Sequence, residues 1–365
     1  MKKTPPYTFI IAGGGTGGHL FPGIAVAKEL SRRFQEASII FVVSRRKMES
    51  KILSQYGYGM TSIDVEGIKG RGWKKGFSVL LKMPANILRS VLTIKRLSPI
   101  AVLGMGGYSS GPICLAAKFM GIATAIHEQN SYPGLTNRIL SKFADRIFVS
   151  FEETLKYFKG KKVFLTGNPV REELFSSCSI SAGKNRNLTV LVLGGSQGSV
   201  AINKAFAEAL SIMKTRGKEI DVIHQTGERD YGRVAEEYLA KGIKGELLPF
   251  IEDMRAVYSR ADLVISRAGA SAIFELAATR KPSILIPYPY AADQHQKLNA
   301  LALVRIGGAE MICQNDLTGE RIANILIKYI DNPEILREMG NRAGMAAVHD
   351  AARLIVDLLV ELIRK

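Results

Sequence analysis

The sequence predicts an α/β protein built from two doubly wound, Rossmann-like domains in tandem. Short runs rich in β-branched residues alternate with stretches of helical periodicity, which is the pattern of parallel strands covered on both faces. The alternation starts again after residue 187, and each half opens with a strand that runs into glycines. At 365 residues the chain is long enough for two domains, each with its own core.

The first half is expected to contain strands separated by helices such as 24–34. These strands are Thr8–Ala12, Ile39–Val43, Ala101–Leu103, Thr124–Ile126, Arg146–Val149 and Val163–Leu165. The second half repeats the pattern with Leu188–Leu193, Ile220–Ile223, Glu246–Leu248, Leu263–Ile265 and Ser283–Ile286, and it ends in helices from Thr318 onward. The polar stretch SSCSISAGKNRN marks a linker near 168–187, so the predicted domains are residues 1–168 and 169–365.

Charge is distributed unevenly between the two halves. The chain has a formal net charge of +17, and residues 1–170 hold 25 Lys and Arg against 9 Asp and Glu. Residues 171–365 are nearly balanced, with 25 against 24. The asymmetry indicates that the first half meets a polyanionic surface, either nucleic acid or anionic lipid. The plainer interpretation is a basic protein whose charge only keeps it soluble.

Composition argues against several classes of protein. No apolar run approaches the roughly 20 residues that a membrane-spanning helix needs. The basic start, MKKTPPYTFIIAGGG, has too short an apolar run for a signal peptide, so we expect the protein to stay inside the cell. Three widely spaced cysteines indicate neither a disulfide framework nor a zinc site.

A glycine-rich loop follows the first strand of the first half. IIAGGGTGGHLFPG places Gly13, Gly15 and Gly18 in the G-x-G-x-x-G spacing of dinucleotide-binding folds. The next strand should end in an acidic residue if the ligand were NAD, but residues 44–46 read Ser-Arg-Arg. The motif therefore argues against NAD and leaves NADP open.

A matching loop opens the second half. VLVLGGSQG places Gly194, Gly195 and Gly198 around Ser196. Glycines let a phosphate approach the backbone, and the Ser196 hydroxyl can donate to a phosphate oxygen. Two such loops at the start of matched halves indicate a ligand held between the domains.

Polar residues follow other strands of the first half, in GMGGYSSGP and HEQNSYPG. In an open α/β sheet the loops at the carboxyl ends of the strands border the ligand crevice. We therefore expect one cleft to be lined by His19, Tyr108, His127, Glu128 and Asn130.

The stretch from Val264 to Ala300 combines several ligand-binding features. A strand runs through a small-residue turn into a helix, whose first N–H groups attract anions. Glu275, in the first two turns of that helix, can accept two hydrogen bonds from a ribose diol. The amide side chains of Gln296 and Asn299 suit neutral sugar hydroxyls.

Residues 67–97 pair apolar anchors with basic neighbours, as interfacial segments do. The segment includes Trp73, Phe77, Leu80 and Leu81 interleaved with Lys69, Arg71, Lys74, Lys75 and Lys82. It is expected to touch an anionic membrane surface. The alternative is a core helix with a solvated basic side.

On these motifs the chain resembles the MurG family of GT-B glycosyltransferases. The resemblance covers nearly the whole chain in six ordered blocks: GGGTGGHLFPG, LGMGGYSSGP, HEQN, GNPVR, LGGSQG and SRAGASAIFE…DQHQKLNA. It implies a GT-B fold with a cleft between two Rossmann-like domains, and a last helix, about 350–365, that packs back toward the first domain. The implied reaction moves GlcNAc from UDP-GlcNAc to the MurNAc C4 hydroxyl of lipid I (undecaprenyl-diphosphate-MurNAc-pentapeptide), giving lipid II. The implied location is peripheral, at the cytoplasmic face of the bacterial inner membrane.

The resemblance also implies which residues bind UDP-GlcNAc. Thr16, Gly17 and Gly18 border the diphosphate-sugar, Asn130 touches the GlcNAc, Arg171 and Ser196 lie near the phosphates, and Ile251 meets the uracil through its backbone. The nucleotide is wrapped by Ala270, Ser271, Ala272, Ile273, Phe274 and Glu275, with Glu275 on the ribose, while Gln296 and Asn299 read the sugar. Ser271 and Ala272 occupy a variable part of the nucleotide loop.

Inverting transfer to a sugar hydroxyl requires one general base. His19 is the first candidate, because an imidazole has a pKa near the working pH, and Glu128 in the HEQN loop is the second. No D-x-D sequence occurs, so neither a metal held by such a motif nor another cofactor is expected. Helix N-termini and Arg171 would then stabilise the departing diphosphate.

Three other functions are compatible with parts of the pattern. A UDP-sugar transferase could act on another membrane lipid, such as diacylglycerol. An NADP-dependent oxidoreductase would use Arg45 and Arg46 on the 2′-phosphate, but it leaves the second glycine loop and Glu275 unexplained. A nucleic-acid binder would explain the basic first half, but no RNP, zinc or helix-turn-helix pattern supports it, so no nucleic-acid partner is expected.

Overall fold

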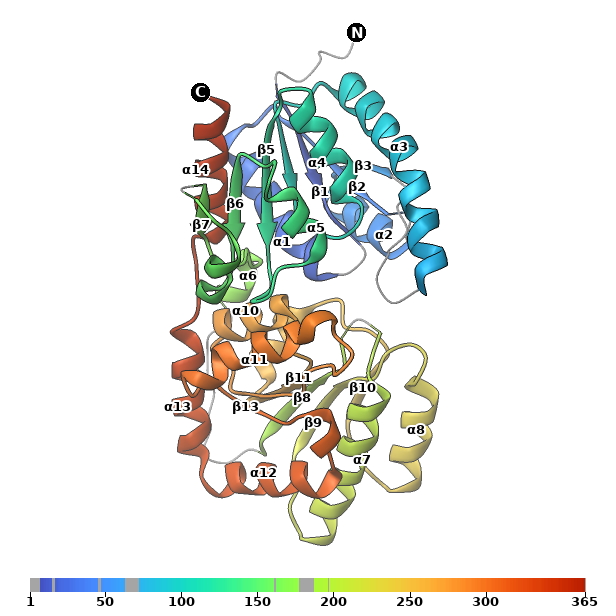
Figure 1. Cartoon of the computed structure of the whole chain (residues 1–365). Coiled ribbons are helices and arrows are strands. Elements are labelled where there is room, and N and C mark those ends of the chain that lie inside the picture. Colours follow the sequence, from blue (N-terminus) through green and yellow to red (C-terminus); the bar gives the residue numbers. More distant parts are fainter. Residues whose placement is uncertain are drawn as a thin grey trace. The chain divides into compact units, whose positions relative to one another are not determined.

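The chain forms two compact units (Figure 1). Unit 1 comprises Met1–Arg171 and Asp350–Lys365, and unit 2 comprises Glu172–His349. The computed structural model describes residues 7–14, 17–44, 47–62, 72–160, 162–176, 187–195 and 197–364, without the side chains of residues 47, 48 and 72–82. The linker predicted near 168–187 falls partly outside this range, and residues 172–175 within it form a short helix.

Unit 1 is built on a seven-stranded parallel sheet with the order β3-β2-β1-β4-β5-β6-β7. Its strands are β1 (Thr8–Ala12), β2 (Ser38–Val43), β3 (Gly59–Ser62), β4 (Ala101–Gly104), β5 (Ala123–Glu128), β6 (Arg146–Val149) and β7 (Val163–Leu165). The helices are α1 (Gly17–Arg33), α2 (Lys47–Gln55), α3 (Gly72–Leu97), α4 (Ser110–Phe119), α5 (Leu135–Leu140), the 3₁₀ helix η1 (Glu152–Tyr157) and α14 (Ala351–Ile363). The strand order reverses between β1 and β4, which is where ligands bind in sheets of this kind.

Alternate residues of the strands supply two cores, one on each face of this sheet. Phe9 and Ile11 of β1 pack on one face together with Ile355 and Val356 of α14. Ile10 of β1 belongs to the core on the other face, which α4 covers. Both faces are therefore apolar, which explains why β1 reads as a continuous hydrophobic run. Helix α14, although last in the chain, completes unit 1 by packing against α1.

Unit 2 repeats this plan with a six-stranded parallel sheet in the order β10-β9-β8-β11-β12-β13. Its strands are β8 (Thr189–Leu193), β9 (Asp221–Gln225), β10 (Glu246–Leu248), β11 (Leu263–Ser266), β12 (Ser283–Leu285) and β13 (Ala309–Met311). The helices are α6 (Glu172–Phe175), α7 (Val200–Thr215), α8 (Tyr231–Ala240), α9 (Met254–Arg260), α10 (Ala270–Ala278), α11 (His295–Arg305), α12 (Gly319–Asp331) and α13 (Pro333–Gly344), with 3₁₀ helices η2 (Ala292–Gln294) and η3 (Gln314–Asp316). Here the order reverses between β8 and β11.

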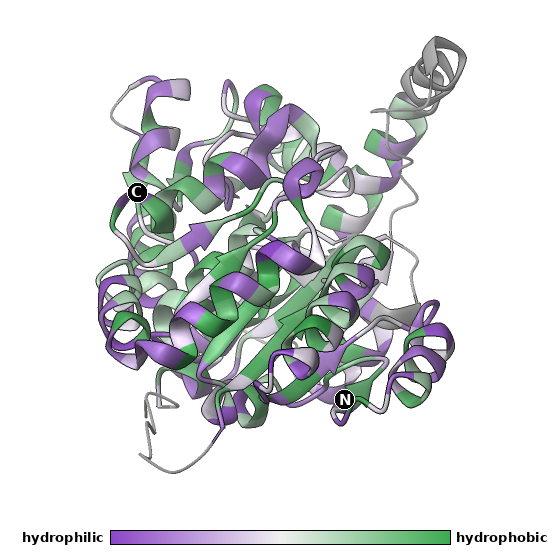
Figure 2. Cartoon of the chain, turned by 90° about the horizontal axis from the view of Figure 1, so that it is seen from below, coloured by the Kyte–Doolittle hydropathy of each residue, from purple (hydrophilic) through white to green (hydrophobic). Residues whose placement is uncertain are grey.

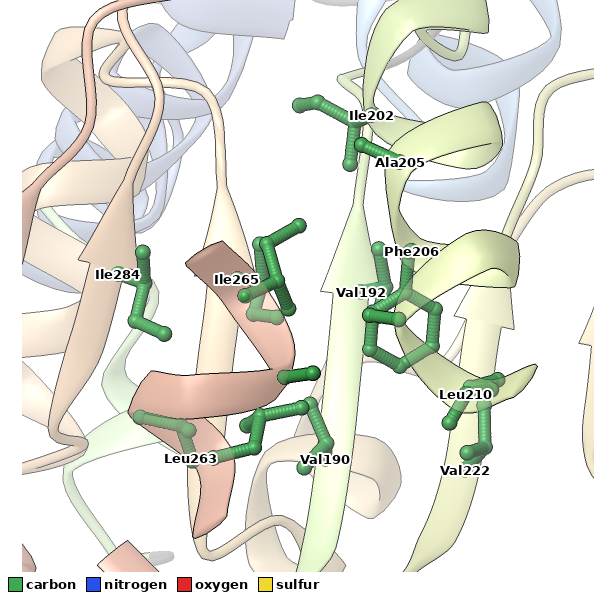
Figure 3. Close-up of a cluster of buried hydrophobic side chains, with 14 of the residues drawn as sticks. Val190, Val192, Ile202, Ala205, Phe206, Leu210, Val222, Leu263, Ile265 and Ile284 are labelled. Atoms are coloured by element: carbon green, nitrogen blue, oxygen red, sulfur yellow. The ribbon is translucent and has the colours of Figure 1, made fainter. Parts of the chain in front are cut away.

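The core of unit 2 lies between this sheet and the helices that cover it. Figure 3 shows Val190 and Val192 of β8 beside Ile265 of β11, with Phe206 and Leu210 of α7 packed against them. Phe206 is fully buried. Truncating a buried Phe to Ala typically costs about 3–5 kcal/mol, so this contact is a main contribution to the stability of the unit.

Side chains define where several helices of unit 2 begin. The hydroxyl of Ser199 accepts from the backbone N–H of Ile202 at the start of α7. Asp253 does the same for Ala256 at the start of α9. These caps satisfy N–H groups that have no partner inside the helix. They also fix the loops at the carboxyl ends of β8 and β10.

Hydropathy follows the layers of the fold. Figure 2 shows apolar residues along the strands and hydrophilic residues on the outer sides of the surrounding helices. Within the described part of the chain, no helix has both the length and the apolar character needed to cross a membrane.

The predicted fold class, two parallel-sheet Rossmann-like domains, is confirmed. Two strands were not predicted, β3 (Gly59–Ser62) and β13 (Ala309–Met311). Each lies at an edge of its sheet and is only partly buried. An edge strand has no need of a continuous apolar run, so neither segment stands out in the sequence.

Candidate functional site

In unit 1 the polar residues gather at the carboxyl ends of three adjacent strands, β1, β4 and β5. The loops that leave these strands contain Gly13–Gly14, Met105–Tyr108 and Gln129–Gly134. Their position at the point where the strand order reverses makes them the candidate ligand-binding edge of this unit.

Glycines allow the loops after β1 and β4 to pack backbone against backbone. A Cβ on Gly13 would lie 2.7 Å from Cβ of Met105, and one on Gly107 would lie 2.7 Å from the carbonyl oxygen of Gly14. Gly106 has a positive φ of 88°, and a Cβ there would lie 3.1 Å from Cε1 of His19. The loop after β4 can therefore lie this close to the His19 ring only because Gly106 and Gly107 lack side chains.

His19 is the third residue of α1 and is partly buried. Its Nδ1 lies 3.0 Å from Oε1 of Gln129, in the loop after β5. Gly17 and Gly18 are the first two residues of the same helix, so their backbone belongs to its N-terminus. Thr16 lies outside the described residues.

Glu128, the last residue of β5, is enclosed by hydrogen-bond donors. Its Oε1 accepts from the backbone N–H (3.0 Å) and the side-chain amide (3.1 Å) of Asn130. Its Oε2 accepts from the backbone N–H of Gly134 (2.9 Å) and from Nδ2 of Asn137 (2.8 Å). The side chain is 1% exposed, so all four donors reach a carboxylate that solvent hardly contacts. This arrangement orients Asn130 and engages both carboxylate oxygens.

His127 is fully buried one position earlier on β5. Its Nε2 lies 3.1 Å from the carbonyl oxygen of Gly167, and its Nδ1 lies 2.9 Å from Nε2 of Gln129. Burial lowers the pKa of His127 to about 4, so the ring is neutral at physiological pH.

Other predicted residues of unit 1 occupy different places. Arg171 ends the first segment of unit 1, and its guanidinium lies 4.8 Å from the ring centroid of Phe21, on α1. The side chains expected at the membrane, Trp73, Lys74, Lys75, Phe77, Leu80 and Leu81, lie outside the described residues, although the backbone there forms the first part of α3.

In unit 2 the corresponding loop follows β8 and leads into α7. Gly198 has a φ of 75°, and a Cβ there would lie 2.0 Å from the carbonyl oxygen of Thr226, in the loop after β9. Gly227 makes the reciprocal approach, with a virtual Cβ 2.5 Å from the carbonyl oxygen of Gln197. The two loops thus need glycine at both positions. Ser196 lies outside the described residues.

Gln225, the last residue of β9, links this loop to the chain after β10. Its Nε2 donates to the carbonyl oxygen of Gly195 (2.9 Å), and its Oε1 accepts from the backbone N–H of Ile251 (2.9 Å). Since this bond uses the N–H of Ile251, the carbonyl oxygen is the backbone group that this residue can offer to a uracil N–H.

Arg267 lies directly after β11 and contacts three other segments. Its guanidinium donates to the backbone carbonyls of Ile286 (3.1 Å) and Pro287 (3.3 Å), to Oγ of Ser199 (2.7 Å) and to Oε1 of Gln314 (2.7 Å). It also lies 5.4 Å from the ring centroid of Tyr288. All of these partners are neutral. Burial lowers the pKa of Arg267, but an arginine stays charged at physiological pH.

Helix α10 begins at Ala270, after Gly269, and carries Glu275 in its second turn. Oε2 of Glu275 accepts from the buried hydroxyl of Tyr258, on α9, at 3.1 Å. Along the same helix Ala270, Ile273 and Phe274 are buried, whereas Ser271 and Ala272 are partly exposed. Ile273 and Phe274 therefore pack inside the unit and can contribute to a ligand site mainly through their backbone.

Gln296 and Asn299 lie on α11. Oε1 of Gln296 accepts from the backbone N–H of Tyr288 (2.9 Å), and Nδ2 of Asn299 donates to the carbonyl oxygen of Ala268 (3.3 Å). Two consecutive residues before this helix, Asp293 and Gln294, have left-handed backbone with φ near 53° and 52°. Non-glycine residues adopt this conformation at a cost, and it clusters at functional loops.

The structure adds residues that the sequence did not single out, namely Gln225, Tyr258 and the side-chain contacts of Arg267 and Gln129. Gln129 was visible within HEQN and Arg267 within the turn after β11, but their partners were not. Gln225 ends a mostly buried strand, and a polar residue at such a strand end is a usable signal. Tyr258 lies within a short helix and gave no signal.

Comparison with known protein families gives two matches that together span most of the chain. Residues 9–149 match the glycosyltransferase family 28 N-terminal domain, and residues 189–355 match the glycosyltransferase family 28 C-terminal domain.

Similar proteins extend over nearly the full length. A protein of Syntrophus aciditrophicus is 46% identical over 355 residues, covering 97% of this chain and 98% of its own. One of Myxococcus xanthus is 42% identical, covering 97% and 92%. Both are named UDP-N-acetylglucosamine–N-acetylmuramyl-(pentapeptide) pyrophosphoryl-undecaprenol N-acetylglucosamine transferase.

Solved structures give a consistent result. The crystal structure of Acinetobacter baumannii MurG matches with a TM-score of 0.77 and 31% identity, covering 98% of this chain and all of that one. A UDP-GlcNAc 2-epimerase from Neisseria meningitidis, bound to UDP-GlcNAc, matches with a TM-score of 0.69 over 97% of this chain and all of that one. At 16% identity the second likeness concerns the fold alone.

Proposed function

The chain belongs to glycosyltransferase family 28, and we propose that it transfers N-acetylglucosamine from UDP-GlcNAc to undecaprenyl-pyrophosphoryl-MurNAc-pentapeptide, converting lipid I into lipid II. The observation that carries this function is the 46% identity, over 97% of the chain, to a relative named for this reaction. The chain is thus a UDP-GlcNAc hexosyltransferase. Its family membership argues against the alternative that it is an NADP-dependent oxidoreductase.

The test compares acceptors. Release of UDP from UDP-GlcNAc should require lipid I or a short-chain analogue of it, and diacylglycerol should not replace it. Turnover with diacylglycerol and none with lipid I would assign the chain to the other lipid acceptor.

In the donor half of the reaction, the edge of the unit 2 sheet is proposed to bind the nucleotide. Glu275 is proposed to accept from the ribose hydroxyls, with its Oε2 oriented by the hydrogen bond from the Tyr258 hydroxyl (3.1 Å). The carbonyl oxygen of Ile251 accepts from the uracil. The N-terminus of α10 attracts the diphosphate, and the charge of Arg267 at the same sheet edge supports it.

We propose that amide side chains recognise the sugar by hydrogen bonds to its hydroxyls. Gln296 of α11 offers both a donor and an acceptor, as a polyhydroxyl ligand requires, and Asn130 of unit 1 is a further proposed contact. Asn299 is fully buried and would act by holding the carbonyl oxygen of Ala268 (3.3 Å). Arg171 and Ser196 remain proposed contacts of the phosphates.

For the chemical step we assign the base to His19 and a structural role to Glu128. Both oxygens of Glu128 accept from neutral N–H groups, and the residue is 1% exposed, so it is poorly placed to take a proton from a substrate. His19 is only partly buried. In the proposed step His19 removes the proton from the MurNAc C4 hydroxyl, the oxygen bonds to C1 of GlcNAc, and the bond from C1 to UDP breaks with its electron pair leaving on UDP. Attack opposite the leaving group inverts C1.

Unit 1 is proposed to dock on an anionic membrane surface at the cytoplasmic face. Its net basic charge supports this, as do exposed apolar side chains beside cations. Leu88 and Leu92, one turn apart on α3, are 61% and 58% exposed, and Arg89 between them is also exposed. On the neighbouring α4, Phe119 is exposed and its ring centroid lies 6.3 Å from that of Phe143.

Vesicle binding tests this docking. Replacing Trp73, Phe77, Leu88 and Leu92 with Ser should reduce binding to phosphatidylglycerol vesicles while turnover of a water-soluble acceptor stays unchanged. High salt should weaken binding as well, because it screens charges near a surface. Binding that survives both the substitutions and the salt would place the membrane contact elsewhere.

A further inference from the structure

Three side chains of unit 1 form a continuous hydrogen-bonded chain that ends at the candidate base. From the inside outward they are His127, Gln129 and His19. Two backbone carbonyls, of Gly167 and Met105, anchor this chain. A carbonyl oxygen can only accept, so the direction of each hydrogen bond in the chain follows from these two anchors.

The first anchor determines the tautomer of His127. Its Nε2 lies 3.1 Å from the carbonyl oxygen of Gly167, so Nε2 carries the proton and donates it there. The hydroxyl of Ser150, 3.4 Å from the same nitrogen, donates to the carbonyl oxygen of Glu128 (3.0 Å) and so leaves this assignment unchanged. Burial lowers the pKa of His127 to about 4, so the ring holds one proton and its Nδ1 must accept.

The second anchor determines the orientation of Gln129. Its Nε2 lies 2.8 Å from the carbonyl oxygen of Met105 and 2.9 Å from Nδ1 of His127. Both are acceptors, so the NH₂ group faces them and uses one hydrogen on each. Reversing the amide would set an oxygen against two acceptors in a place where the side chain is 1% exposed, which costs at least one buried hydrogen bond.

We propose that Gln129 is a positioning residue that holds His19 as the Nδ1–H tautomer and so leaves Nε2 as its proton-accepting nitrogen. With the amide oriented as described, Oε1 of Gln129 faces Nδ1 of His19 at 3.0 Å and can only accept. This rests on the proposed role of His19 as the base, because it concerns which nitrogen of that ring accepts the proton.

A neutral amide differs here from the carboxylate that orients the histidine of a Ser-His-Asp triad. It fixes ring orientation and tautomer without adding a negative charge beside the imidazole. It also does not take up the proton, because an amide is a very weak base, and Nδ1 of His127 behind it already accepts from Gln129 in a ring whose pKa burial lowers to about 4. The proton that Nε2 accepts therefore leaves by the same nitrogen. Gly106 adds a steric constraint, because a Cβ there would lie 3.1 Å from Cε1 of His19.

The tautomer can be measured without any assay of activity. The chain has 5 histidines, so ¹⁵N-labelled imidazole signals of the full-length protein can be assigned by single substitutions and read at pH 8. We expect His127 as the Nε2–H tautomer and His19 as the Nδ1–H tautomer. A His19 signal from the Nε2–H tautomer would overturn the proposal, whichever residue is the base.

Two substitutions separate positioning from packing. Gln129→Met keeps the size of the side chain but removes the acceptor, so His19 should lose the Nδ1–H signature. We expect kcat to fall about 10–100-fold, the range found when the hydrogen-bond partner behind a metal-bound imidazole is removed. Gln129→Glu keeps an acceptor toward Nδ1 of His19, so it should retain the His19 signature. Its second oxygen faces the two acceptors that the NH₂ group served, so the free energy of unfolding should fall and kcat should lie between the values of Gln129→Met and the wild type. The KM for UDP-GlcNAc should stay within about twofold in both.

The outcomes distinguish this proposal from the assignment of the base. If His19 keeps the Nδ1–H tautomer in Gln129→Met, the amide does not control it and the proposal fails. If the tautomers change as expected but His19→Ala retains near-normal kcat, the positioning by Gln129 stands and the base is another group. Thermal unfolding of both variants checks that they fold. If Gln129→Met does not fold, the His19 tautomer measured in the wild-type protein still tests the proposal.

Discussion

Each unit has a charged side chain surrounded by neutral hydrogen-bonding groups at the carboxyl ends of its strands, a buried glutamate in unit 1 and a partly exposed arginine in unit 2. Glu128 accepts from four neutral N–H groups, and Arg267 donates to four neutral oxygens. Among the described residues neither forms an ion pair. Neutral hydrogen-bond partners offset the loss of hydration of Glu128, and Arg267 has the ring of Tyr288 beside its neutral partners as well.

The two charges differ in what they can do for a ligand. Glu128 is enclosed and acts on its own surroundings, by fixing Asn130 and the turn to Gly134. Arg267 is partly exposed and has no carboxylate to neutralise it, so its field extends to the sheet edge. Under the proposed function, the edge of unit 1 would therefore serve a neutral hydroxyl and its proton, and that of unit 2 an anion. The predictions that follow test this division of roles.

The largest effect is expected at the base. His19→Ala should lower kcat by about 10²–10⁴, because a positioned general base contributes that much, while the Kd of UDP-GlcNAc changes little. Single-turnover kinetics and donor binding by calorimetry measure the two quantities. A mutant that loses donor affinity and keeps kcat would make His19 a binding residue.

Glu128→Gln is the matched control for that variant. It places an NH₂ group where a carboxylate oxygen accepts two N–H groups, so it should lower the free energy of unfolding by about 1–3 kcal/mol. In protein that remains folded, kcat should fall much less than in His19→Ala. A loss of kcat equal to that of His19→Ala, with stability intact, would instead make Glu128 the base.

The next effect concerns the ribose. Glu275→Ala should weaken UDP-GlcNAc binding by about 2–4 kcal/mol, as expected for the loss of two charged hydrogen bonds. A 2′,3′-dideoxy analogue of UDP should bind the variant and the wild type alike. Tyr258→Phe, which only releases the carboxylate from its 3.1 Å hydrogen bond, should weaken binding by about 1 kcal/mol or less. Equal affinity of Glu275→Ala and wild type for UDP-GlcNAc would remove Glu275 from the site.

The charge of Arg267 is tested with ligands that differ in phosphate. Arg267→Met should weaken UDP by about 1.5–3 kcal/mol and leave uridine, which has no phosphate, nearly unchanged. Arg267→Lys keeps the charge but not the planar set of donors, so its affinity for UDP should lie between those of Arg267→Met and the wild type. If UDP and uridine weaken equally, Arg267 only shapes the loops around Ser199 and Gln314.

Much of this fold could be predicted from the sequence, and the successes share a cause. Strands such as Thr8–Ala12 and Arg146–Val149 agree with the prediction to the residue, because both faces of a central parallel strand are buried and the run must be apolar. The edge strands at 59–62 and 309–311 are under no such demand and were missed.

The candidate site was predictable only as far as its loops. Glycine spacing located both switch points, because a close approach such as that of Gly198 to Thr226 leaves a local signal. The hydrogen bonds that distinguish a base from a structural residue leave no such local signal in the sequence. His19 and Gln129 are 110 residues apart, and Tyr258 and Glu275 are 17 apart on different helices. Such pairs depend on how the sheet brings separate segments together, which no single stretch encodes.

The smallest expected effect is on the pH dependence of stability, and it concerns one buried histidine in each unit, His127 and His224. Nε2 of His224 donates to Oδ1 of Asn203 (3.0 Å), and its Nδ1 accepts from the hydroxyl of Tyr238 (2.9 Å), with Asp230 nearby. Burial lowers the pKa of both histidines from 6.5 to about 4. Both are therefore neutral in the folded protein at pH values where the unfolded chain already binds a proton.

The sign of the pH effect follows from that difference. The stabilising contribution of each neutral histidine is fully present above pH 6.5 and is lost as the pH falls toward 4, by about 2 kcal/mol per histidine at pH 5. Hydrogen exchange at pH 7.5 and pH 5 can measure it separately in peptides from each unit. His127→Gln should flatten the pH dependence in unit 1 alone, and His224→Gln in unit 2 alone. A pH dependence that neither substitution changes would show that other groups cause it, and a change in both units at once would show that the two unfold together.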